Sequence, residues 1–261
     1  MFNTLLSTQQ DIGFGQYSGW RGAGIGVLPA PMHRTIIYVD VEGFASPDRT
    51  NADQTAVRGG LYHALAEAFT AAGVPWEDCY HEDRGDGALI LVPADVPKGI
   101  LVTAVPSGLA AALHQHNRTH HRHARIRLRM AIHAGEVLSD EHGVAGVAIN
   151  LTARLLEAKA LKRALRRSSG EVALIASQWY FDEVIRHHAA SFPSSYRRVR
   201  VSVKQTKVMA WLRRPAVPFP PPASRITPRT GDLLTGATPA SVYVSQPFSV
   251  PGRAPRRGAR R

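Results

Sequence analysis

The stretch RTIIYVDVEGF, residues 34–44, constrains the fold of this chain more than any other segment. Its β-branched and apolar residues predict a strand buried in a sheet, and Gly43 is expected to end it. We expect later strands of the chain to flank this strand on both sides. The carboxylate of Asp40 would then lie near the end of a buried strand.

Hydrophobic periodicity predicts the other elements. Between residues 124 and 137, Ile126, Leu128 and Met130 alternate with three arginines, which indicates a strand with its apolar side inward. Further strands are predicted up to residue 80 and at 88–93, 171–177, 195–203 and 207–212. Helices are predicted at 52–72, 98–117, 149–165 and 177–188, with a glycine-rich loop at 143–148.

This order of elements predicts an α+β fold. A ferredoxin-like βαββαβ core comes first, and αβ-αββ elements extend it. We expect a mostly antiparallel sheet with helices covering one of its faces. The folded domain is expected at residues 32–212, after a flexible leader at 1–31 and before a disordered tail at 213–261.

The charge of the chain is concentrated in that tail. The formal net charge is +12, and the segment from Pro215 onward contains seven arginines and one acid, Asp232. Such a segment favours an unstructured, solubilising tail, and contact with nucleic acid or an acidic partner is the alternative. The body of the protein is only moderately basic.

The sequence also predicts where the protein resides. No apolar run is long enough for a transmembrane helix, and residues 1–20 do not have the pattern of a secretory signal. The single cysteine, Cys79, cannot form an internal disulfide, which suits a reducing compartment. We therefore expect a cytoplasmic protein.

Residues 81–87, HEDRGDG, form an unusually acidic hairpin between two apolar runs. The order of elements predicts that Asp86 in this turn meets Asp40 at one edge of the sheet. Two adjacent carboxylates repel each other unless a cation lies between them, and Mg²⁺ or Mn²⁺ prefers oxygen ligands. Backbone amides near Gly43 and Phe44 would then face a bound phosphate.

Four segments together resemble the motifs of class III nucleotidyl cyclases, the adenylyl and guanylyl cyclase catalytic domain. They are YVDVEGF, RGDGALI, LRMAIHAGEV and GVAGVAINLTARLL, and the resemblance covers residues 33–212. It implies that Asp40 and Asp86 bind two Mg²⁺ or Mn²⁺ ions. It also implies that Asn150 orients the ribose and that Arg154 stabilises the transition state.

The resemblance further implies which residues bind the triphosphate and the base. Lys204 matches a lysine that reaches the triphosphate, although Gln205 replaces the glycine that usually follows. Glu82 matches the base-reading position, where a carboxylate accepts hydrogen bonds from guanine. The second base-reading position is Gly143, which has no side chain. GTP is therefore favoured, while ATP and pyrimidine substrates stay open.

The family builds its sites between two subunits, so the resemblance implies a homodimer. The predicted function is the metal-dependent conversion of a nucleoside triphosphate to a 3′,5′-cyclic nucleotide and pyrophosphate. The alternative is a catalytically weak or inactive cyclase-like module that binds a nucleotide or a partner protein.

Three other features have simpler interpretations. The histidine-rich residues 114–123 are expected to form a solvated loop, with a zinc site as the alternative. The cations of residues 161–167 suit a helix C-terminus, with binding to an anionic surface as the alternative. Asp83 and Arg84 are expected to form a local surface pair.

Overall fold

The structure is a computed structural model that describes residues 30–213. Apart from residues 30, 31 and 213, the predicted leader and the predicted basic tail lie outside the described residues. The strands are β1 Met32–Val41, β2 Tyr80–Asp83, β3 Gly87–Val92, β4 Leu128–Asp140, β5 Gly143–Ala145, β6 Val172–Ser177, β7 Tyr196–Val203 and β8 Thr206–Arg213. The helices are α1 Asn51–Ala71, α2 Ala104–Thr119, α3 Val147–Leu156, α4 Lys159–Arg167 and the short α5 Gln178–Tyr180.

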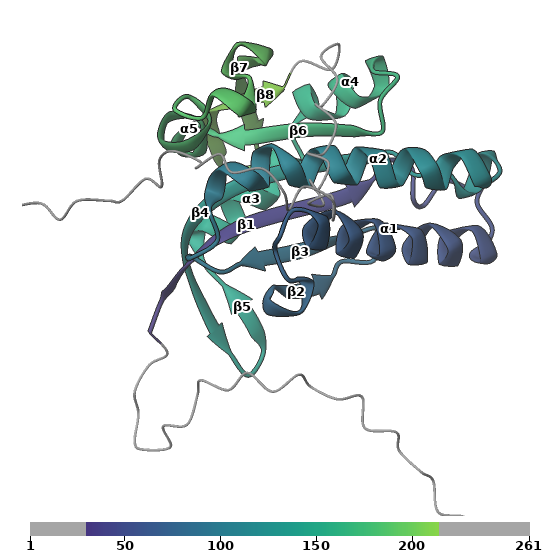
Figure 1. The fold of residues 1–261 in the computed structure, drawn as a ribbon, viewed down its shortest axis with the longest axis horizontal. Coiled ribbons are helices and arrows are strands. Elements are labelled where there is room, and N and C mark those ends of the chain that lie inside the picture. Colours follow the sequence, from purple (N-terminus) through teal and green to yellow (C-terminus); the bar gives the residue numbers. More distant parts are fainter. Residues whose placement is uncertain (1–29, 214–261) are drawn as a thin grey trace, which may run out of the picture. The chain divides into compact units, whose positions relative to one another are not determined.

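The strands form one sheet in the order β2-β3-β1-β4-β6-β8-β7, with β5 paired to β4 (Figure 1). The first four strands in this spatial order, β2-β3-β1-β4, have the ferredoxin-like arrangement, with β1 between β3 and β4. Among the described strands only β4 and β6 pair in parallel. The α+β class and the mostly antiparallel sheet are therefore confirmed.

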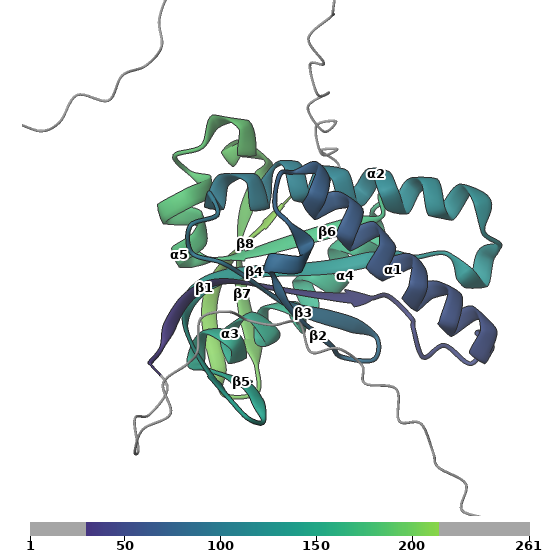
Figure 2. The ribbon, with the colours of Figure 1, turned by 60° about the horizontal axis from the view of Figure 1, so that its bottom comes forward.

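Helices cover both faces of this sheet, so the expectation of a single covered face was wrong. In Figure 2, α1 and α2 lie on one side of the strands and α3 lies on the other. Along β1, Ile37 and Val39 join the core under α1 and α2, whereas Ile36 and Tyr38 join the core with α3 and α4. A strand that is apolar on both faces needs cover on both, and the sequence of β1 has this property.

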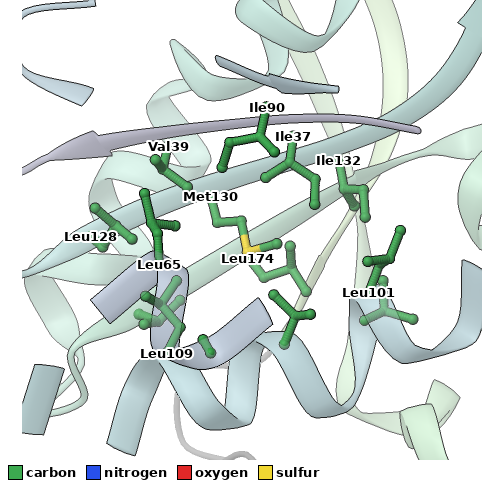
Figure 3. Close-up of a cluster of buried hydrophobic side chains, with 14 of the residues drawn as sticks. Ile37, Val39, Leu65, Ile90, Leu101, Leu109, Leu128, Met130, Ile132 and Leu174 are labelled. Atoms are coloured by element: carbon green, nitrogen blue, oxygen red, sulfur yellow. The ribbon is translucent and has the colours of Figure 1, made fainter. Parts of the chain in front are cut away.

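The core under α1 and α2 is continuous and apolar (Figure 3). Leu65 from α1 and Leu109 from α2 are fully buried against the strands. Thr50 begins α1 with a capping box, in which its side chain and that of Asp53 each bond the other residue's backbone. This layer holds β1 in place and so fixes the position of its end.

The alternation in β4 is confirmed on its apolar side. Leu128 and Met130 are buried, as is Ile126 just before the strand. The arginines behave differently from a solvent-facing row, because Arg127 and Arg129 are partly covered and lie on the face of α3 and α4. Arg125 is the arginine of this group that is exposed.

The predicted helix at 149–165 is broken at residues 157–158 into α3 and α4. In a straight helix, Ile149 and Leu156 would lie nearly opposite Leu161 and Leu165. The break turns α4 so that both apolar stripes pack into the same core. Tertiary packing has therefore overridden the continuous helical pattern.

Other boundaries also differ from the sequence predictions. The strand expected to end at Tyr80 begins there, because Pro75 leads into a 3-10 turn at Trp76–Asp78. Part of the predicted loop at 143–148 is strand β5. Residues 98–102 form a 3-10 turn before α2, and the predicted helix at 177–188 is α5 followed by a π-helical turn.

The predicted histidine loop is partly helical as well. Residues 114–119 lie in α2, where His116 stacks on His120 just beyond the helix. No helix in residues 30–213 has the length and apolar character needed to cross a membrane.

Candidate active site

Asp40 and Asp86 lie side by side where β1 ends. Asp40 is paired in register with Gly87, and the Val41 N–H donates to the Asp86 carbonyl at 2.8 Å. Gly85 takes a positive φ of 82° in the turn. A side chain at Gly87 would overlap the backbone of Val39, so a glycine there lets β3 approach the end of β1.

Arg129 from β4 completes this group, which we call the acidic corner: Asp40, Asp86 and Arg129. Oδ1 of Asp40 lies 2.6 Å from Nε of Arg129, and their side chains are only 15% and 13% exposed. This ion pair offsets part of the Asp40 charge, so a cation that binds the same oxygen would compete with Arg129.

The raised pKa of Asp40 also favours the binding of a cation at this carboxyl. Burial raises the pKa of its carboxyl to about 6; the guanidinium of Arg129 opposes the rise and the neighbouring Asp86 adds to it. A carboxyl whose charge is disfavoured by a second carboxylate gains from a bound cation. Asp86 itself is exposed, so an ion could reach the pair from solvent.

The acidic corner suits an Mg²⁺ or Mn²⁺ ion that takes most of its ligands from water and substrate. It does not suit an ion enclosed by protein ligands alone. In residues 30–213 no set of three or more histidine, cysteine, aspartate or glutamate side chains is placed to hold a metal ion. Mg²⁺ needs only one or two carboxylates when waters and substrate phosphates supply the remaining ligands. The adjacent carboxylates of Asp40 and Asp86, with Asp86 open to solvent, match that requirement.

Gly43 and Phe44 form the turn directly after β1. Gly43 has a φ of 66°, which a glycine adopts without strain. The Phe44 N–H donates to the Val41 carbonyl at 3.4 Å, a long bond, and the Phe44 ring packs on the core under α1 and α2. The turn thus carries its backbone around the end of β1, next to the acidic corner.

Glu82, on β2, lies beside Tyr80 and Gly143. Its carboxylate accepts from the Tyr80 hydroxyl at 3.3 Å and pairs with Arg84 at 3.1 Å. Gly143 has a φ of 125°, and a side chain there would begin 3.9 Å from the Tyr80 hydroxyl. The structure therefore brings the two predicted base-reading positions together, with a tyrosine between them.

Asn150 and Arg154 lie one turn apart on α3. Asn150 is exposed, and Arg154 pairs with Glu157 at 2.9 Å at the end of the same helix. Their spacing of four places both side chains on one flank of the helix. The flank offers an amide and a guanidinium to a ligand that approaches α3.

Lys204 occupies the tight turn between β7 and β8. Its side chain is exposed and its φ is 50°, a left-handed conformation that costs a lysine energy. Gln205 follows without a positive φ. The left-handed position of this turn is therefore Lys204 and not Gln205.

No family model matches the chain, and no curated protein does. Among solved structures it is similar to the guanylyl cyclase Cya2, at 18% identity and a TM-score of 0.49, over 72% of this chain and 93% of that one. A bacterial light-regulated adenylyl cyclase is 13% identical with a TM-score of 0.49, over 75% of this chain and 56% of the other. An adenylate/guanylate cyclase/hydrolase from Silicibacter pomeroyi is 21% identical with a TM-score of 0.47, over 71% of this chain and 98% of its own.

The fold resembles that of guanylyl and adenylyl cyclase domains. At these identities and TM-scores the likeness concerns the arrangement of helices and strands alone.

Three residues that lie near the predicted site residues were not identified from the sequence. Arg129 was read as a solvent-facing strand residue, and Tyr80 as the end of a strand. Lys162, on α4, carries a charge that acts on Asp40, yet it lies 122 residues away in the chain. The alternation of β4 marks Arg129 as lying opposite the apolar face, but no local pattern marks the other two.

The expected Asp83–Arg84 pair was wrong. Asp83 pairs with Arg58 of α1, and its Oδ1 accepts from the Gly85 N–H at 2.5 Å. Arg84 instead pairs with Glu82 and lies over the Tyr38 ring. Alternation along β2 explains the difference, because Glu82 and Asp83 point to opposite faces of the sheet.

A hollow of about 460 Å³ opens beside β4 and α3 and is lined by Pro31, His133, Glu136, Leu138, Gly146, Val147, Ala148 and Leu151. Burial lowers the pKa of His133 to about 4, and its Nδ1 lies 2.8 Å from the Ser177 hydroxyl. His133 is therefore neutral at pH 7 and is held by a structural contact. Val147 is 86% exposed at the rim of this hollow.

Proposed function

We propose that this protein is a metal-dependent nucleotidyl cyclase. It would convert a nucleoside triphosphate to a 3′,5′-cyclic nucleotide and pyrophosphate in the cytoplasm. The observation that supports this proposal most directly is that Asp40 and Asp86 lie next to each other at the end of β1. Two carboxylates there suit the binding of a metal–triphosphate complex.

The carboxylates of Asp40 and Asp86 would hold two Mg²⁺ or Mn²⁺ ions. When bound, such ions polarise the attacking ribose oxygen and the α-phosphate. The turn at Gly43 and Phe44 would lie along the phosphates, and Lys204 would neutralise part of their charge. Arg129 would have to release Asp40 as the metal binds, since both compete for the same oxygen.

Ring closure requires no protein nucleophile. The ribose 3′-hydroxyl gives its proton to water, its oxygen forms a bond to the α-phosphorus, and the bond to the leaving pyrophosphate breaks. Asn150 would hold the ribose in position for this attack. Arg154 would stabilise the negative charge that develops on the phosphate, as a guanidinium with several donors can.

Glu82 favours guanine as the base. A carboxylate accepts hydrogen bonds from the N–H groups of guanine, whereas it would face the N1 acceptor of adenine. Tyr80 lies where a side chain at position 143 would otherwise reach, so it is suited to contact the same base edge. We therefore propose GTP as the preferred substrate.

The active unit would be a homodimer. This chain carries both the acidic corner and the Asn150–Arg154 flank of α3, so two copies could form two complete sites. In each site the acidic corner would come from one copy, with Glu82, Asn150 and Arg154 from the other. Mixing Asp86→Asn chains with Arg154→Ala chains should then restore activity that neither variant has alone.

Incubation of the purified protein with Mn²⁺ and each of the four NTPs, followed by detection of cyclic products, tests the proposed function. We expect cyclic GMP in the largest amount, and Asp86→Asn should lower the rate by about 10³-fold. Asp95→Asn, an exposed aspartate in another loop, is the matched control and should leave the rate unchanged. Absence of every cyclic product at high protein concentration would refute the proposal.

Ion pairs within the chain favour a second candidate, a cyclase-like module that binds nucleotides with little turnover. Asp40, Glu82 and Arg154 each lie in an ion pair, with Arg129, Arg84 and Glu157 respectively. A site held this way binds its ligand only after these pairs separate. Calorimetric binding of GTP without any turnover would support this candidate over the enzyme.

A further inference from the structure

Helix α4 presents an unusually dense cationic surface. Its nine residues include five basic side chains and no acid, and all five are exposed: Lys159, Lys162, Arg163, Arg166 and Arg167. The opposite side of the helix, with Leu161 and Leu165, is buried in the core of that face. Because its apolar side is occupied, α4 cannot insert into a membrane and offers only its charges.

The end of α4 is tied to the segment that follows Asp40. Arg127 donates to the carbonyl oxygens of Leu165 and Ser168, and it pairs with Glu42 at 3.1 Å. Glu42 lies two residues after Asp40. α4 also packs on β4, which carries Arg129 of the acidic corner.

Helical periodicity distributes the five cations over two flanks of the helix. Lys162 and Arg166 lie toward one flank of α4, Arg163 and Arg167 lie toward the other, and Lys159 lies between them. The flank of Lys162 is the one that faces the acidic corner. Lys162 lies close enough to Asp40 for its charge to act on that carboxylate.

The balance of charge decides what this flank would bind. Asp40, Glu42 and Asp86 are offset by Arg127, Arg129 and Lys162, and the other four cations of α4 leave the region positive. Metal ions on the carboxylates would increase that excess. A rigid positive surface beside a metal site attracts and orients anions with several phosphates.

We propose that α4 forms a cationic rim of the acidic corner and that Lys162 positions the polyphosphate of the substrate or the pyrophosphate product. This inference deepens the proposed function and rests on it for the identity of the nucleotide. Lys162 is a positioning residue that acts on phosphates and is not required for the chemical step. Its loss should raise KM more than it lowers kcat.

Calorimetric titration of the full-length protein with inorganic tripolyphosphate in EDTA at low salt tests the proposal directly. Lys162→Gln should weaken binding about fivefold. Arg163→Gln, an equal change of charge on the other flank, is the matched control and should weaken it less than about twofold. Both side chains are exposed, so unchanged thermal melting would show that the variants fold.

The outcomes separate this inference from the proposed function. Tripolyphosphate has no nucleoside, so a flank-specific loss of its binding supports the inference even if no NTP is cyclised. If cyclic product forms and Lys162→Gln retains the wild-type KM and tripolyphosphate affinity, the inference fails while the proposed function stands. Equal weakening of tripolyphosphate binding by Lys162→Gln and Arg163→Gln would also overturn the inference. So would tighter binding of single-stranded DNA than of tripolyphosphate, if both variants weaken the DNA binding equally.

Discussion

The face of the sheet under α1 and α2 differs from the face under α3 and α4, although the same strands supply both. β1 gives Ile37 and Val39 to the first face and Tyr38 and Asp40 to the second. β4 likewise gives Leu128 and Met130 to the first and Arg129 to the second. The face under α1 and α2 is an apolar core, whereas the face under α3 and α4 has a charged edge beside its apolar core.

The apolar face contributes mainly to the stability of the fold, and the charged edge carries the groups that could take part in chemistry. Closely packed apolar side chains under α1 and α2 hold the strands, and the charged edge under α3 and α4 depends on that support. Ionisable groups in partly buried positions reduce stability but gain the perturbed pKa values that function uses. Substitutions on the two faces should therefore have opposite consequences.

Removing a buried side chain from the first face should have the largest effect on stability. Leu109 is fully buried, so Leu109→Ala should lower the free energy of unfolding by about 3 kcal/mol. Chemical denaturation measures this change. Leu138→Ala, a 43% exposed leucine on β4, is the control and should cost less than about 1 kcal/mol. Similar losses in both variants would contradict the stabilising role of burial under α1 and α2.

Removing the charge of Asp40 should stabilise the protein. Its carboxyl has a pKa raised to about 6 by burial, so above that pH the fold holds a disfavoured carboxylate. Asn resembles the protonated acid, and Asp40→Asn should raise the unfolding free energy at pH 7.5 by about 2 kcal/mol.

The pH dependence of that gain follows from the sign of the shift. The unfolded carboxyl ionises near pH 4 and the folded one near 6, so the gain should grow between these values and then stay constant. Denaturation at several pH values measures it, with Asp95→Asn as the control. A loss of stability at pH 7.5 would show that the Arg129 pair outweighs the cost of burial.

Acidic pH should weaken metal binding at the second face. As pH falls through about 6, Asp40 takes up a proton and can no longer bind a cation well, whereas an ordinary aspartate remains ionised. The affinity for Mn²⁺ should fall about tenfold between pH 7 and pH 5. Titration followed by electron paramagnetic resonance measures it, and a constant affinity down to pH 5 would contradict the raised pKa.

Releasing Glu82 from its ion pair should have the smallest effect. Glu82 and Arg84 are each more than a third exposed, so their pair is weak. Arg84→Met should raise kcat/KM for GTP relative to ATP by about threefold, because the carboxylate becomes free to meet guanine. Arg58→Met, which removes the partner of Asp83, is the control. An equal response in both variants would argue against base reading by Glu82.

Sequence patterns located most of the fold because each pattern is local. The apolar run of β1 and the alternation around Ile126 and Met130 predicted strands that the structure contains. The order of these elements predicted the α+β class, and it predicted that Asp40 and Asp86 would meet. The predictions were wrong where one sequence pattern is compatible with two structures. The predicted helix at 149–165, for example, is two helices separated at residues 157–158.

By itself, then, the sequence determined the strands, the class of fold and which carboxylates share an edge of the sheet, since backbone period and chain order specify these. Only the tertiary structure decided that both faces are covered, that Arg129 pairs with Asp40, and that Tyr80 lies beside Gly143. It also decided that α4 lies near the acidic corner. These contacts join residues far apart in the chain, and packing between elements selects them.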